Sequence, residues 1–391
     1  MPLALDPGST LPRDGDAGTL IGRVWRPDRD GPSVVAVRGG ALHDISAAAP
    51  TVRDLCEAAD PAALARSAPG ELVGSVNDIL ANTPRSGRDT ARPWLLAPID
   101  LQAIKAAGVT FAVSMLERVV EEQARGDPEK ALEFRASVVE IIGDDLSKLQ
   151  PGSEEAAALK RVLIEKGAWS QYLEVGIGPD AEVFPKAPVL SAVGTGLEIG
   201  VHPHSTWNNP EPEIVLVVSS AGRIVGATLG NDVNLRDFEG RSALLLSKAK
   251  DNTASAALGP FVRLFDGTFT LDDVRRAEVR LTVTGGDGFE MEGVSSMSQI
   301  SRDPADLVAQ TIGPNHQYPD GFVLYLGTMF APTQDRQAPG QGFTHEVGDL
   351  VTVASEQLGV LTNQVVRCPD AEPWTFGIAD LMRNLAARKL I

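Results

Sequence analysis

"EPEIVLVVSSAGRIVGATLGND", residues 211–232, consists of two apolar runs that are joined by a short polar stretch. Short runs of β-branched and aliphatic residues bounded by turn residues are typical of strands. Ala221 and Gly222 supply a turn between the two runs. The stretch therefore predicts an antiparallel hairpin in which residue 211 lies opposite residue 232.

Three acidic residues stand at the open end of this hairpin. Side chains alternate between the two faces of a strand, so Glu211 and Glu213 point the same way. Asp232 lies across from Glu211, with Cβ atoms about 4.5–5.5 Å apart. Three carboxylates in this space repel one another, and a divalent cation that prefers oxygen ligands, Mg²⁺ or Mn²⁺, would relieve the repulsion. The spacing alone leaves a second interpretation open, a solvated hairpin end with surface acids.

Composition argues against several classes of partner. The chain of 391 residues is 43% apolar and carries a net charge of −17, without a basic run interleaved with aromatic residues, so nucleic acid is not an expected partner. Neither a signal peptide nor a membrane span is indicated, which favours a cytoplasmic protein without a membrane partner. Cys56 and Cys368 are far apart and are interpreted as core thiols. The five histidines show no zinc-site spacing.

The chain is expected to form two domains. Residues 1–97 show short strands, a Gly39-Gly40 turn and then a polar, proline-containing stretch, which predicts a small N-terminal α/β domain and a linker. Residues 98–391 are expected to form the larger domain. Its strands lack the alternation with helices that a Rossmann sheet requires, so the pattern favours a curled or sandwich-like β-core in an α+β protein.

Helical periodicity is concentrated in one part of the second domain. Candidate helices span about 102–125, 128–147 and 153–167, and they define a helical insert at about 118–168. A further amphipathic helix is predicted from residue 378 to residue 390.

Two lysines follow the acidic residues closely in the sequence. Lys248 and Lys250 lie in "SALLLSKAKDNTASAALGP", residues 242–260. Each is either an ordinary surface cation or a positive charge directed at an anionic substrate or a developing oxyanion.

Several motifs in this order resemble the fumarylacetoacetate hydrolase superfamily. They are "EPE", "GNDVNLRDFE", a lysine before "LGP", "YLGTMFAP", "VGDLV" and "LGVLTNQV", and the resemblance covers residues 98–391. It implies a mixed β-roll with a divalent metal, Mg²⁺ in the first place, on Glu211, Glu213 and Asp232. It also implies that Lys250 is the active-site lysine.

A closer resemblance runs nearly end to end. "AGVTFAVSMLERVVEE", "SQYLEVGIGPDAEVF" and "HQYPDGF" are similar to the long-chain bacterial 2-keto-3-deoxy-D-xylonate dehydratases, also called 2-dehydro-3-deoxy-D-arabonate dehydratases. This implies a hydro-lyase of D-xylose degradation that converts the 2-keto-3-deoxy sugar acid to 2-oxoglutarate semialdehyde. Family habit implies a homodimer or homotetramer.

One departure from the wider superfamily bears on the chemistry. Members that cleave C–C bonds have a histidine and a glutamate that activate water, whereas this chain keeps Glu117 but has Ser114 at the histidine position. A serine hydroxyl is not a base near neutral pH. Elimination of water needs no external nucleophile, so the departure favours a lyase over a hydrolase.

The resemblance also implies individual roles. Lys250 and Glu117 are the candidates for proton transfer, without an assignment of acid and base between them, and three residues are placed on the substrate side: Ser114, Lys186 and Thr328. A C–C hydrolase or decarboxylase of a diketo or oxaloacetate-like acid is the nearer alternative. A non-catalytic binder of sugar acids is the more distant one.

Overall fold

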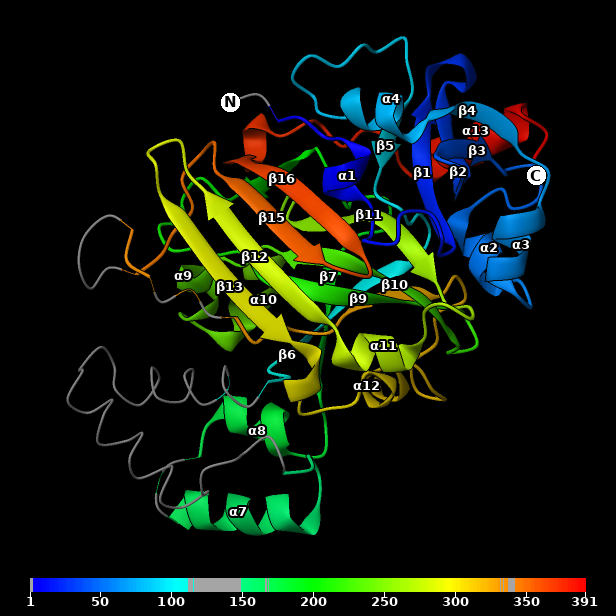
Figure 1. Ribbon diagram of the computed structural model, residues 1–391. Helices are drawn as coiled ribbons and strands as arrows, with labels where there is room; N and C mark the ends of the chain where they lie inside the picture. The colour runs from blue at the N-terminus through cyan, green and yellow to red at the C-terminus, as the bar shows by residue number, and fades with distance from the viewer. Residues whose placement is uncertain are drawn as a thin grey trace.

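Two β-sheets form the body of the protein in the computed structural model (Figure 1), which describes residues 3–111, 115, 149–165, 167, 169–330, 332, 334–336 and 342–391. The larger sheet has 11 strands and the smaller has 5. The larger has the order β4 (Glu71–Ser75), β3 (Ala41–Asp44), β2 (Gly31–Arg38), β1 (Leu20–Arg26), β11 (Ala256–Leu264), β10 (Ile224–Asp232), β9 (Pro212–Val218), β14 (Phe322–Tyr325), β6 (Ala103–Gly108) and β7 (Glu182–Ala187), with β5 (Trp94–Leu96) paired to β1. The smaller has the order β13 (Glu290–Ser296), β12 (Glu278–Thr284), β15 (Leu350–Ser355), β16 (Gly359–Arg367) and β8 (Glu198–Val201).

The described helices are short, and most of them lie around these sheets, whereas the two at residues 154–165 and 171–177 project away from the sheets (Figure 1). They are α1 (Pro7–Thr10), α2 (Val52–Glu57), α3 (Pro61–Ser67), α4 (Val76–Ala81), α7 (Glu154–Glu165), α8 (Gln171–Ile177), α9 (Arg236–Glu239), α10 (Leu246–Lys250), α11 (Leu271–Arg276), α12 (Pro304–Thr311) and α13 (Ile378–Ala387), with single 3-10 turns at η1 (Pro27–Arg29), η3 (Ala243–Leu245), η4 (Met297–Gln299) and η5 (Cys368–Asp370). No helix among the described residues is long and apolar enough to cross a membrane.

The core explains why strand β9 is apolar on both faces. Its residues Ile214 and Leu216 pack in a cluster with residues of the smaller sheet such as Leu281. The alternate residues, such as Val215, belong to a second cluster that includes Leu55 of α2. A strand that is covered on both faces has an unbroken apolar sequence. The prediction of a curled or sandwich-like β-core is therefore confirmed.

The β9–β10 hairpin has the predicted register at its open end. Glu213 faces Gly230 and Pro212 faces Asn231, and the N–H of Asp232 donates to the carbonyl of Glu211 at 3.0 Å. A bulge near the turn shifts the pairing between Ile224 and Gly226. The bulge lies far from the acidic residues, so the predicted pairing of 211 with 232 is confirmed.

The predicted helix at 102–125 is wrong at its start. Residues 103–108 form β6, which pairs in parallel with β14 and antiparallel with β7. Short apolar runs do not separate strand from helix by periodicity, and here two partner strands supply the backbone hydrogen bonds. Residues 112–114 and 116–148 lie outside the described residues, and with them the helix at 128–147 and most of the predicted insert.

Two other helix predictions are confirmed. The helix predicted at 153–167 is α7, and the hydroxyl of Ser153 accepts a hydrogen bond from the N–H of Ala156 at 3.1 Å, as a helix N-cap does. The predicted C-terminal helix is α13. Of the two cysteines, Cys56 is a buried free thiol as predicted, whereas Cys368 is only partly buried because it lies in the turn η5.

The N-terminal segment extends the larger sheet. Strand β1 pairs antiparallel with β11, with Leu20 facing Arg263 and Ile21 facing Val262. Strands β1 to β4 therefore continue the sheet that contains the acidic hairpin. The domain boundary at residue 97 stays a prediction.

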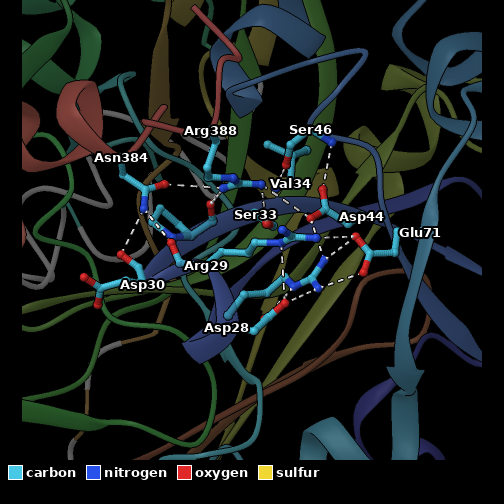
Figure 2. Close-up of polar contacts among 12 residues, drawn as sticks. Asp28, Arg29, Asp30, Ser33, Val34, Asp44, Ser46, Glu71, Asn384 and Arg388 are labelled. Atoms are coloured by element: carbon cyan, nitrogen blue, oxygen red, sulfur yellow. Dashed lines mark hydrogen bonds and ion pairs between the residues drawn. The ribbon is translucent and has the colours of Figure 1, made fainter. Parts of the chain in front are cut away.

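Buried charges attach α13 to this N-terminal part of the sheet (Figure 2). The guanidinium of Arg26, a residue that is 5% exposed, donates to Asp44 at 3.1 Å and to Glu71 at 3.0 Å. Arg388 follows α13, donates to the carbonyl of Pro32 at 2.7 Å and lies 3.5 Å from Asp44. The two arginines thus share the carboxylate of Asp44, and the end of the chain is joined to β2 and β3.

Replacement of Arg388 by methionine should lower the free energy of unfolding by about 1–3 kcal/mol, because buried acceptors lose a charged donor. Chemical denaturation of the full chain measures the change. The matched control is Arg383→Met on α13, whose side chain is 76% exposed and, within the described part of the chain, forms an ion pair with Asp380 alone. That variant should change the free energy by less than about 0.5 kcal/mol. Equal losses in both variants would contradict the role given to Arg388.

Candidate metal centre

Three carboxylates meet at the end of the β9–β10 hairpin. Glu211, Glu213 and Asp232 are 5%, 2% and 1% exposed, and each offers an oxygen within 4.8 Å of those of the other two. Among the described residues, they form the one group of three or more acidic, histidine or cysteine side chains with this spacing. The predicted convergence is confirmed. The interpretation as surface acids is wrong, because the surrounding structure buries the hairpin end.

Backbone and amide donors hold the two glutamates in place. The N–H of Gly327 donates to Glu213 at 2.6 Å, and the side-chain amide of Asn234 donates to Glu211 at 3.0 Å. Gly327 has a φ of 85°, and a Cβ at this position would lie 2.1 Å from the hydroxyl oxygen of Thr110. Because only glycine fits this conformation and this space, Gly327 can direct its N–H at Glu213.

Lys250 extends from α10 into the acidic cluster. Its Nζ lies 2.5 Å from Glu211 Oε2 and 3.0 Å from Asp232 Oδ2, and the residue is 4% exposed. Burial opposes the charge on Lys250, but Asp232 and Glu211 outweigh that cost and raise its pKa above the ordinary value. The two carboxylates therefore favour the charged form of the lysine. The interpretation of Lys250 as an ordinary surface cation is therefore wrong, because the residue is buried.

Lys186 of β7 approaches the cluster from within the protein. The residue is fully buried, and its Nζ lies 2.8 Å from Asp232 Oδ1, 3.1 Å from the carbonyl of Val233 and 3.2 Å from the hydroxyl of Ser255. It also donates to the carbonyl of Lys250. Lys186 is not among the described residues that line the adjoining cavity. These contacts hold the side chain of Asp232 and the backbone of Lys250 in position. The predicted role of Lys186 in substrate binding stays a prediction.

A cavity opens beside the cluster. Thr328 lines it, as its predicted place on the substrate side requires, and so does Met115. Ser114 and Glu117 lie outside the described residues. The other described residues that line the cavity are Ala107, Gly108, Val109, Glu182, Phe184, Asn209, Glu211, Glu213, Asp232, Arg236, Glu239, Leu246, Lys250, Gly327 and Phe330.

The hairpin and most of the residues that line its cavity lie within a region that matches a known family. Residues 177–366 match the family described as "Fumarylacetoacetate (FAA) hydrolase C-terminal". These residues form a fumarylacetoacetate hydrolase domain. All three carboxylates, Lys250 and Thr328 belong to it.

Two curated relatives of this chain are named as dehydratases. One is the "Probable 2-keto-3-deoxyxylonate dehydratase" of Haloferax volcanii, 26% identical over 332 residues that cover 85% of this chain and 94% of the relative. The other is the "2-dehydro-3-deoxy-D-arabinonate dehydratase" of Saccharolobus solfataricus, 29% identical over 187 residues that cover 47% of this chain and 58% of the relative.

A solved structure has the same fold. It is described as "2-keto-3-deoxy-D-arabinonate dehydratase complexed with magnesium and 2,5-dioxopentanoate" and superposes with a TM-score of 0.59 at 20% sequence identity. The match covers 89% of this chain and 99% of that one. The mixed β-roll expected from the sequence is therefore the observed fold.

The charges of the fumarylacetoacetate hydrolase domain fit a divalent cation. Two lysines contact Asp232 and one contacts Glu211, but Glu213 has no ion pair within the described residues. Burial raises the pKa of Glu213 well above its ordinary value, and the charges of Asp232 and Glu211 raise it further. A hard cation on the three carboxylates would supply the missing positive charge, and their oxygens are the ligands that Mg²⁺ and Mn²⁺ prefer.

Three charged residues of the cavity were not predicted from the sequence. Arg236 and Glu239 lie on α9, and Glu239 accepts a hydrogen bond at 2.6 Å from the amide of Asn234, which also donates to Glu211. Glu182 lies on β7, four residues before Lys186. Strand alternation places Glu182 on the same face as Phe184, which also lines the cavity.

Proposed function

We propose that this chain is a Mg²⁺-dependent hydro-lyase that removes water from 2-keto-3-deoxy-D-xylonate and forms 2,5-dioxopentanoate, also called 2-oxoglutarate semialdehyde. The observation that carries the proposal is the buried set of three carboxylates with Lys250, in a chain that aligns with 94% of a relative named as a dehydratase. The names of the two relatives describe one substrate, since carbons 2 and 3 of the keto-deoxy acid are no longer stereogenic.

Removal of water from the proposed substrate requires a base that takes a proton from C3 and an acid that protonates the C4 hydroxyl. Mg²⁺, or Mn²⁺ in its place, held by Glu211, Glu213 and Asp232 would supply a Lewis acid that makes the C3 protons of a bound 2-keto acid more acidic. Lys250 is the proposed acid, because its ammonium group lies in the cavity beside the carboxylates and has a proton to give to the hydroxyl that leaves C4 as water. Glu117 is the proposed base.

The remaining chemistry is a rearrangement of protons. Loss of water leaves a C3–C4 double bond, and transfer of a proton from C5 to C3 gives an enol that becomes the C5 aldehyde. The hydroxyl of Thr328 is proposed to donate to the substrate in the cavity. Lys186 is proposed to act indirectly, by fixing Asp232 and the carbonyl of Lys250.

A direct assay tests this function. Purified protein is incubated with 2-keto-3-deoxy-D-xylonate and Mg²⁺, with and without EDTA, and the product is coupled to a semialdehyde dehydrogenase and identified by mass spectrometry. We expect turnover that depends on the metal and a product that has lost one water. Cleavage with gain of water, or loss of CO₂, would establish the hydrolase or decarboxylase instead. Tight metal-dependent binding without turnover would establish a binding protein.

The cellular location and the oligomeric state are proposed from the same resemblance. We propose a cytoplasmic homodimer or homotetramer in which residues 1–97 serve as a scaffold. Light scattering coupled to size-exclusion chromatography measures the mass in solution, and a monomer at working concentration would contradict the oligomer.

A further inference from the structure

A second cavity lies on the other side of the segment that carries Lys250. Helices α9 and α10 lie side by side (Figure 1), and each of them contributes residues to both cavities. Arg236 of α9 and Lys250 of α10 line the metal cavity. Phe238 of α9 and Lys248 of α10 line the second cavity, together with Arg241 just after α9. This division follows from helix geometry, because residues three or four positions apart share a face.

Two exposed cations, Arg241 and Lys248, each lie near the ring of Phe238 at this second cavity. The guanidinium carbon of Arg241 lies 4.5 Å from the ring centroid of Phe238, and Lys248 Nζ lies 5.5 Å from the same centroid. Within the described part of the chain, neither cation is within 4.0 Å of a carboxylate oxygen, whereas most other basic residues are paired. Both side chains are exposed, so water screens their charges, and a doubly charged anion beside the ring would contact both.

Two histidines complete the lining. The rings of His202 and His204 lie 5.4 Å apart, and that of His202 lies 5.2 Å from Phe238. The Nδ1 atom of His202 accepts the backbone N–H of His204 at 3.1 Å. A neutral His202 must then carry its proton on Nε2, which makes that nitrogen a donor. All four side chains are therefore suited to donate hydrogen bonds.

The acidic residue of this cavity is already engaged. Asp237 accepts from the hydroxyl of Ser205 at 2.8 Å through Oδ1 and from the N–H of Thr206 at 2.9 Å through Oδ2. It therefore orders the loop before β9 and is not paired with Arg241 or Lys248. A metal ion is not favoured, because two cations line the cavity and its His and Asp ligand atoms are not among the described groups spaced for a metal.

We propose that this cavity binds a small oxyanion with two negative charges, a phosphate group or a dicarboxylate, between Arg241 and Lys248 with His202 and His204 as further donors. Such an anion would accept two parallel hydrogen bonds from the guanidinium of Arg241. It would also form an ion pair with the ammonium of Lys248. It would also join the end of α9 to α10, and so would bind to the outer face of the segment that presents Lys250.

Titration calorimetry of the full chain tests the site with inorganic phosphate, succinate and acetate at matched ionic strength. Each titration is carried out with saturating Mg²⁺ and again with EDTA, so that anions bound at the metal centre are recognised. We expect phosphate or succinate to bind with a Kd of about 1 mM or below with and without metal, at least about tenfold tighter than acetate. Whichever of phosphate and succinate binds more tightly shows whether the site prefers a phosphate group or a dicarboxylate.

A double variant, Arg241→Gln with Lys248→Gln, should weaken binding of the preferred anion at least about tenfold. The charge control is Arg280→Gln in β12, whose side chain is 68% exposed, and it should bind as the wild type does. The ring resonances of His202 and His204 should shift on titration in the wild type and not in the double variant. Binding that needs Mg²⁺, that survives in the double variant or that is lost equally in the control would overturn the proposal.

Discussion

Replacement of Glu213 by glutamine should reduce kcat/KM of the proposed dehydratase at least about a thousandfold, since a Lewis acid contributes several kcal/mol and each factor of ten corresponds to about 1.4 kcal/mol. The amide keeps the size of the side chain and one acceptor oxygen, but it removes the charge that the cation needs. Affinity for Mg²⁺, measured by calorimetry, should fall together with activity.

The stability of the metal-free Glu213→Gln variant separates this role from a structural one. In the wild type, burial and the charges of Asp232 and Glu211 oppose ionisation of Glu213. A neutral amide relieves that repulsion, so the thermal midpoint without metal should stay the same or rise. Glu292→Gln, at an exposed position of β13, is the matched control and should retain activity and metal affinity. Full activity of Glu213→Gln would show that the metal ligands lie elsewhere.

The site could be predicted because its geometry is local. Strand alternation places Glu211 and Glu213 on one face, and a tight turn at Ala221-Gly222 fixes which residue lies across from them. The bulge near Ile224 is confined to the turn end of the hairpin, and the pairing at Asp232 was correctly predicted. The spacing of side chains along one hairpin was therefore sufficient to predict which three carboxylates converge.

Features that depend on distant segments could not be predicted in the same way. Residues 103–108 form a strand because β14 and β7 flank them, and both of these strands come much later in the sequence. The burial of Lys186 beneath Asp232 depends on the position of β7 at the opposite edge of the sheet from β4. The pairing of β1 with β11 joins residues more than 200 positions apart, and no periodic pattern indicates such a partner.

Replacement of Lys250 by methionine should reduce kcat by about a hundredfold to ten-thousandfold, the range for loss of a positioned proton donor. The effect of this replacement on the affinity for Mg²⁺ should be opposite to that of Glu213→Gln. The ammonium lies 2.5 Å from Glu211 and 3.0 Å from Asp232, so it competes with a cation for the same carboxylates. Affinity for Mg²⁺ should therefore be retained or rise, while the metal-free protein should lose about 3 kcal/mol of stability because two buried carboxylates lose their partner.

Lys250→Arg distinguishes proton transfer from charge alone. Arginine keeps the positive charge but does not release a proton at physiological pH. If Lys250 is the acid for the C4 hydroxyl, the arginine variant should retain the stability of the metal-free protein and yet lose kcat as the methionine variant does. Lys389→Met, an exposed position after α13, is the control for loss of a lysine charge. Recovery of kcat in Lys250→Arg to within about tenfold of the wild type would show that Lys250 contributes only its charge, and Glu117, the other candidate for proton transfer, would then be the next acid to test.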